Sequence, residues 1–85
     1  MEIRAVGMQF RGNHVFSENE TLTLERDRHN KFDPNAIKVL ADGKHVAFVA
    51  RENNQAFDPS QVGAVEWKTN WFNGDKIVAA TLRVT

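Results

Sequence analysis

The most informative part of the chain is Glu25-Arg26-Asp27-Arg28-His29-Asn30-Lys31-Phe32-Asp33-Pro34-Asn35-Ala36-Ile37-Lys38-Val39. Apolar and polar residues alternate as they do in half-buried strands at residues 22–24, just before this stretch, and at residues 37–39, at its end. The connection itself combines charged groups, amides, one phenylalanine ring and an Asp-Pro turn. This combination suits a ligand that is partly charged and partly ring, a description that fits the end of a nucleic-acid strand.

Length and composition restrict the class of protein. The chain has 85 residues, with 11 Lys and Arg, 11 Asp and Glu, and no cysteine. We expect a single domain over residues 1–85, without disulfides or thiolate metal sites. The N-terminal Met1-Glu2-Ile3-Arg4 lacks a long apolar run and no segment is long enough to cross a bilayer, so we expect a cytoplasmic protein without membrane contact. Balanced charge argues against a general polyanion binder and favours a small, salt-sensitive site.

Residue patterns predict a mostly β fold with minor α content. We expect strands at residues 2–10, 21–26, 36–40, 45–49, 62–67 and 76–85. A tight hairpin is expected at Asp42-Gly43, a connection at residues 69–75, and a short helix at residues 50–57, closed by Asp58-Pro59. Short, closely spaced strands indicate a small barrel or a curled sheet, with an open sheet covered by a helix as the alternative.

Three motifs carry a family resemblance: Val6-Gly7-Met8-Gln9-Phe10, the run from Asn30 to Val39, and Val46-Ala47-Phe48-Val49. Residues from about 6 to 52 resemble the HIRAN domain. That family occurs at the N-terminus of some helicase-like DNA repair proteins and as small free-standing bacterial and phage proteins. The resemblance implies an OB-like β-barrel of about six strands, with one or two short helices, that binds single-stranded DNA. In the repair helicases it implies capture of a free 3′ end.

The resemblance also implies a set of site residues. Phe10 and Phe32 fall on the two aromatic positions that clamp a base. Asn30 and Asp33 fall on the polar positions that meet the terminal 3′-hydroxyl, and Arg51 falls on a basic position near the terminal phosphates. The predicted nucleic-acid-binding set also includes Lys31 and Arg11.

The chain departs from the well-known eukaryotic members at several of these positions. Both clamping residues, Phe10 and Phe32, are Tyr in those members, so stacking is kept and any contact of the phenol hydroxyl is lost. Gln9 stands where those members have Arg, which removes a phosphate-binding charge. Ala47 and Phe48 replace Gly and His respectively.

Elementary chemistry leads to the same site. Bases stack on aromatic rings for about 1–3 kcal/mol each with little sequence preference, so two exposed Phe rings can sandwich one base. The carboxylate of Asp33 repels phosphate but accepts a hydrogen bond from a hydroxyl. We therefore predict that the site selects the 3′-hydroxyl terminus of single-stranded DNA over a 3′-phosphate.

Each of these residues also has a structural alternative. Phe10 and Phe32 would be core residues, because Phe is usually buried. Asp33 would close the Asp-Pro-Asn turn by accepting backbone N–H groups, and Asn30 would cap the same loop. Arg51 would form a surface ion pair with its neighbour Glu52. Near the last turn, three aromatic residues would form core and rim, although an exposed Trp71 would offer a second stacking platform or a partner contact: Trp67, Trp71 and Phe72.

Catalytic and metal-binding patterns are weak. The three histidines, His14, His29 and His45, lack the spacing of metal ligands. The chain has no Gly-rich phosphate loop, nucleophile elbow or cysteine nucleophile, so we expect a binding module without enzymatic activity, metal or cofactor.

Two other functions stay open at this stage. One is a protein-interaction module that acts on a repair or host protein, alone or as a homodimer paired through the apolar tail at residues 77–84. The other is a small nuclease in which Glu25, Asp27 and Asp33 hold a divalent ion. For the favoured function, the expected partners are single-stranded DNA or DNA ends, with any helicase or nuclease on a separate polypeptide.

Overall fold

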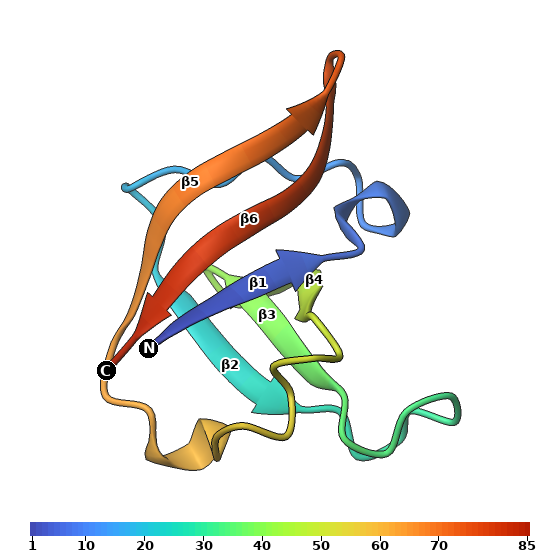
Figure 1. Cartoon of the computed structure of the whole chain (residues 1–85), viewed down its shortest axis with the longest axis vertical. Helices are drawn as coiled ribbons and strands as arrows, with labels where there is room; N and C mark the ends of the chain where they lie inside the picture. Colours follow the sequence, from blue (N-terminus) through green and yellow to red (C-terminus); the bar gives the residue numbers. More distant parts are fainter.

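The computed structural model describes residues 1–85 as one antiparallel six-stranded sheet (Figure 1). The strands are β1 (Glu2–Val6), β2 (Leu22–Arg26), β3 (Ile37–Ala41), β4 (Lys44–Val49), β5 (Val65–Asn73) and β6 (Lys76–Val84). Two 3-10 turns, η1 (Met8–Phe10) and η2 (Pro59–Gln61), are the only helical elements. The predicted mostly β, OB-like class with about six strands and short helical elements is confirmed.

The sheet curls without closing. Its strand order is β2-β3-β4-β1-β6-β5, so β2 and β5 are edges that do not pair with each other. Figure 1 shows the β5-β6-β1 half crossing the β2-β3-β4 half, with the two chain ends side by side. Register shifts in the β3–β4 ladder and at two points of the β5–β6 ladder mark bulges, which strengthen twist and bend a sheet. The strongly curled sheet is therefore barrel-like but open between its edges.

One apolar core fills the inside of the curl. Alternation places Ile37, Val39 and Ala41 of β3 on this face, and Ile3 and Ala5 of β1 do the same. Fifteen buried residues form one continuous cluster, and partly buried side chains such as Leu24 and Trp67 pack against it. This core supports the loops at the strand ends, where the candidate site residues lie.

The first predicted strand is too long. It ends at Val6 because Gly7 has a φ of 80°, which turns the chain into η1. The backbone N–H of Phe10 donates to the carbonyl of Gly7, and buried Met8 fixes the turn to the core. Phe10 therefore stands on a turn beyond the strand and not within it.

The predicted helix at residues 50–57 is wrong. The segment forms successive tight turns in which Asn53 and Ala56 donate to carbonyls three residues earlier. The guanidinium of Arg26 binds the carbonyls of Asn54 and Phe57, which are among the four that would have no partner inside a helix ending at residue 57. A side chain from β2 thus ties this segment of turns to the end of β2.

The last two strands also differ from the prediction. The strand expected at residues 62–67 begins at Val65 and runs to Asn73, so most of the connection expected at residues 69–75 belongs to β5. Only the Gly74-Asp75 turn separates it from β6. The register shift between Trp67 and Thr69 is a bulge within β5 that breaks its alternation, so the sequence pattern does not reveal the full strand.

Candidate nucleic-acid interface

The loop between β2 and β3 is held in shape by its own side chains. The Oδ1 atom of Asn30 accepts from the backbone N–H groups of Phe32 and Asp33, both at 2.9 Å. The Oδ1 atom of Asp33 accepts from the N–H of Asn35 at 2.9 Å. The turn and capping roles given as structural alternatives for Asn30 and Asp33 are therefore present in the structure. They preorganise the same groups that the DNA-binding prediction uses.

Asp33 is the centre of a polar cluster. The side-chain amide of Asn54 donates to its Oδ2 atom at 2.8 Å, and Nε of Arg51 lies 3.5 Å from the same oxygen. The hydrogen bond from the Asn35 N–H, with further stabilisation from Asn54 and Arg51, lowers the pKa of Asp33 and keeps the carboxyl ionised. A negative charge therefore sits at a fixed place in the loop.

Two ion-pair expectations change in this cluster. Arg51 pairs with Asp33 and not with Glu52, which pairs with Arg4 at 3.4 Å. The acidic trio of the nuclease alternative is not gathered either, since Glu25 pairs with Lys38 at 3.4 Å while Asp33 pairs with Arg51. No group of three metal-ligating side chains converges in the structure.

The geometry of the carboxylate leaves room for one more donor. A carboxylate offers about four lone-pair positions, and three protein donors occupy the oxygens of Asp33. The Asn30 side-chain amide is also weakly engaged, because its contact with Asp27 measures 3.4 Å. The cluster can therefore accept one hydrogen bond from a hydroxyl at Asp33 and donate one hydrogen bond from the side-chain amide of Asn30.

Arg26 connects the two loops that carry this cluster. Its NH1 atom donates to the carbonyls of Asn35 at 2.6 Å and of Asn54 at 3.0 Å, and its NH2 atom reaches the carbonyl of Phe57 at 3.5 Å. These bonds connect the end of β2 to both loops that meet at Asp33. Arg26 therefore fixes the relative position of the two loops.

Both predicted stacking rings are exposed. Phe32 is 92% exposed and Phe10 is 81% exposed, so the alternative in which they belong to the core is wrong. Lys31 is exposed beside Phe32 in the same loop. Figure 1 shows η1, which carries Phe10, and the loop of residues 27–36 on the same side of that view. The rings do not stack on each other, so each offers a free face to a ligand.

The strand surface next to η1 is also aromatic and basic. The Arg11 guanidinium lies 6.0 Å from the centre of the Phe48 ring, and His45 meets that ring edge-on at 4.7 Å. Phe48 on β4 is paired in register with Lys38 on β3. Burial and the nearby charge of Arg11 lower the pKa of His45. This surface begins at η1 and runs across β4 toward β3.

The structure thus divides the seven predicted residues into two groups. Asn30, Asp33 and Arg51 form one contact cluster, with Lys31 and Phe32 in the same loop. The second group, on η1 and directly after it, is Phe10 and Arg11. No hydrogen bond or ion pair joins the two groups.

Sequence reasoning missed two residues that build the site. Asn54 is 1% exposed, and a buried amide in a polar segment is the only signal that its side chain has a structural partner. Arg26 looked like one charge among several, although an arginine at a strand end next to two loops is suited to carbonyl contacts. In the sequence, Phe48 stands out only because it replaces the His of the eukaryotic family members, and this replacement assigns it no role.

The family model described as the HIRAN domain matches residues 1–60. Among solved structures, the crystal structure of the HIRAN domain of human HLTF matches with a TM-score of 0.62 and 22% sequence identity, covering 99% of this chain and 73% of that chain. At this identity the likeness shows a shared fold. No curated protein matches the sequence, and no helix of the structure has the length and apolarity to cross a membrane.

The family match covers more than half of the chain and includes the β2–β3 loop with Asn30, Phe32 and Asp33. It ends within η2, before β5 and β6. The chain therefore belongs to the HIRAN domain family.

Proposed function

We propose that this domain binds single-stranded DNA at a free 3′-hydroxyl end. Membership of the HIRAN family supports a DNA-binding module. The observation that carries the finer proposal is the arrangement of the β2–β3 loop. A freely exposed Phe32 ring follows Asn30 and directly precedes an ionised carboxylate, Asp33, which has room for one more donor.

The chemistry of the end explains the choice of terminus. The terminal base stacks on Phe32, with Phe10 as the second face of the clamp. The 3′-hydroxyl donates to Asp33 and accepts from Asn30, while Arg51 balances the charge near the preceding phosphate. A 3′-phosphate would bring further negative charge against Asp33, and like charges brought together cost several kcal/mol.

The test is a fluorescence anisotropy titration of the domain with labelled single strands that end in a 3′-hydroxyl or a 3′-phosphate. We expect the hydroxyl-ended strand to bind about tenfold more tightly or better. Equal affinity for the two strands would disprove end recognition. The fluorophore is attached to the 5′ end of both strands, so that the label does not alter either 3′ terminus.

Phe32→Ala tests the stacking role. Because the ring is 92% exposed, its loss should leave the melting temperature unchanged and weaken DNA binding by about 1–3 kcal/mol. Phe32→Tyr keeps the ring and should bind like the parent, whereas Phe32→Leu should behave like the alanine variant. A drop in melting temperature with unchanged affinity would instead assign the ring a structural role.

In this function the domain acts in DNA repair or at replication forks and supplies end recognition to a helicase or nuclease on a separate polypeptide. The family resemblance supports this context. A fork-unwinding assay with and without the domain would test it, and an unchanged rate on forks with a free 3′ end would count against it.

A second candidate, a protein-interaction module, is favoured by exposed aromatic residues on the last hairpin. Trp71 and Phe72 are each about half exposed, and Val78 is exposed on the neighbouring strand. A homodimer paired through β6 is not available, because β6 already pairs with β1 and β5. Sedimentation velocity of the parent and of Trp71→Ala would test this candidate, with a monomer at all concentrations arguing against self-association.

A further inference from the structure

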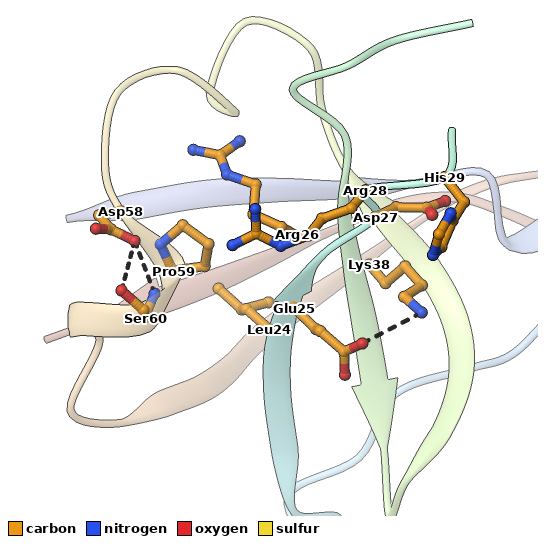
Figure 2. A pocket seen from close by; sticks show the side chains of 10 residues that line it. All are labelled: Leu24, Glu25, Arg26, Asp27, Arg28, His29, Lys38, Asp58, Pro59 and Ser60. Atoms are coloured by element: carbon orange, nitrogen blue, oxygen red, sulfur yellow. Dashed lines mark hydrogen bonds and ion pairs between the residues drawn. The ribbon is translucent and has the colours of Figure 1, made fainter. Parts of the chain in front are cut away.

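An open pocket of about 460 Å³ lies along the outer side of β2, between the start of the β2–β3 loop and η2 (Figure 2). Of the ten residues that line it, Leu24 and Pro59 are apolar and the other eight are charged or polar. None of the seven predicted site residues lines it. Two residues connect it to the Asp33 cluster: Asp27, which contacts Asn30, and Arg26, which holds both loops.

The carboxylates of this pocket are already engaged. Figure 2 shows Glu25 joined to Lys38, and Asp58 joined to Ser60. The Asp58 Oδ1 atom accepts from both the backbone N–H of Ser60 at 3.0 Å and its hydroxyl at 2.7 Å. Asp27 is the contact of the Asn30 amide described above. The acidic groups therefore have protein partners that compete with any cation for them.

The basic groups are less engaged. All hydrogen bonds from Arg26 go to neutral carbonyls, so no carboxylate pairs with its charge. Arg28 and His29 are exposed, and neither takes part in an ion pair or side-chain hydrogen bond. Arg26 and Arg28 line the pocket together with Asp58, and their charges, after the hydrogen bonds from Ser60, lower the pKa of Asp58. The pocket thus offers a fixed cation and a free one.

We propose that this pocket is a second subsite that takes a phosphate of the bound strand upstream of its 3′ end, with Arg28 as the principal contact. This inference rests on the proposed function and extends it. The planar guanidinium fork matches the geometry of phosphate oxygens. Arg26 adds a positive charge that the surrounding carbonyls hold in place.

The first test compares a dinucleotide with a strand of about eight nucleotides, a length within the range covered by one OB fold. In the parent protein the longer strand should bind more tightly. Arg28→Ala should weaken the longer strand about fivefold at ~0.1 M salt and make its salt slope less negative by about 0.7, the value for one phosphate on a single strand. Binding of the dinucleotide should stay unchanged.

Arg83→Ala is the matched control. It removes the same charge from β6, where Arg83 pairs with Glu2 away from the pocket. It should leave both affinities and the salt slope unchanged. Equal losses in the Arg83 and Arg28 variants would mean that only net charge matters, and would overturn the subsite.

Asp58→Asn adds a test in the opposite direction. Asn keeps an oxygen that can cap η2, but it removes the negative charge that competes with phosphate. The longer strand should therefore bind more tightly to this variant, measured below the variant's melting temperature, because some loss of stability is expected when the ionised carboxylate is removed. Unchanged or weaker binding would count against a phosphate in the pocket.

Two further arms separate the sources of phosphate and the two proposals. Inorganic phosphate at millimolar concentration should not abolish the Arg28-dependent gain if the group belongs to the strand, whereas full competition would overturn strand recognition in favour of a free anion site. A 3′-phosphate that does not weaken binding would defeat end recognition, yet the loss caused by Arg28→Ala would still support the subsite. If the longer strand gains nothing over the dinucleotide in the parent, the subsite fails while end recognition stands.

Discussion

Asp33 combines a structural and a recognition role in one carboxylate. Asn35, Asn54 and Arg51 all donate to it or pair with it, so the loop and the charge are set together. The same contacts lower its pKa, so folding favours the ionised form. Its stabilising effect is present above the ordinary carboxyl pKa and is lost as the pH falls below it.

Asp33→Asn should remove the distinction between the two kinds of 3′ end. An Asn side chain can still accept from the Asn35 N–H, but its amide then faces the donors of Asn54 and Arg51, so some loss of stability is expected. The informative quantity is therefore the ratio of the affinities for hydroxyl-ended and phosphate-ended strands, measured below the variant's melting temperature. We expect this ratio to fall toward one, and a ratio equal to that of the parent would show that another group selects the end.

His45 predicts a separate pH effect on stability. Burial and the charge of Arg11 lower its pKa in the folded state, so the unfolded chain binds a proton more readily. Its contribution is complete above the ordinary histidine pKa of about 6.5 and is lost as the pH falls below that value. The melting temperature should decline between about pH 7 and pH 5, above the range in which Asp33 and Asp58 titrate.

His45→Gln removes the titrating ring, so the melting temperature of this variant should change less with pH over this interval. His29→Gln is the control, because that exposed imidazole lies outside the contact with Phe48 and Arg11. Parallel pH profiles for the parent and His45→Gln would exclude His45 as the source of the decline.

At the scale of elements, local chemistry decides what the sequence reveals. The β3–β4 turn is predictable because Asp42 and Gly43 both adopt positive φ, which this dipeptide tolerates. The β2–β3 loop is also predictable from local chemistry, because the side chains of Asn30 and Asp33 accept hydrogen bonds from backbone N–H groups within three residues. The segment at residues 50–57 is not, because its turns are held in place by Arg26, which is 28 residues from Asn54 in the chain.

Arg26→Met tests this long-range link between elements. The change leaves the carbonyls of Asn35 and Asn54 without their donor, in a partly buried place. We expect a loss of about 2–4 kcal/mol in the free energy of unfolding, from the values for hydrogen bonds to charged groups and for unsatisfied buried groups. Chemical denaturation measures this loss.

Arg26→Lys provides the comparison for this variant. Lysine keeps the charge but has one nitrogen in place of NH1 and NH2, which together reach three carbonyls, so it should restore only part of the stability. Amide hydrogen exchange should quicken most in residues 50–57 of both variants. Exchange that quickens evenly over the whole sheet would indicate general destabilisation and would contradict a specific link between the two loops.

For the whole molecule, alternating patterns are enough to predict the curled β fold, because six strands share one apolar core. They do not fix which edges stay open, since the bulges in β4, β5 and β6 interrupt the alternation. They also do not place Phe10 relative to Phe32, because the two rings come from separate elements linked only through the curl of the sheet. The composition of the site is therefore more predictable than its geometry.

The chain as a whole carries no net formal charge at neutral pH. With equal numbers of acidic and basic residues, attraction to DNA comes from a few local cations and not from the net charge of the molecule. If Arg11, Lys31 and Arg51 contact phosphates together with Arg28, three to four contacts give a slope of about −2 to −3 for the logarithm of affinity against the logarithm of salt concentration. Titrations at several salt concentrations measure this slope. A slope twice as steep would require a charged track longer than these residues provide, and a slope near zero would mean that phosphates are not contacted at all.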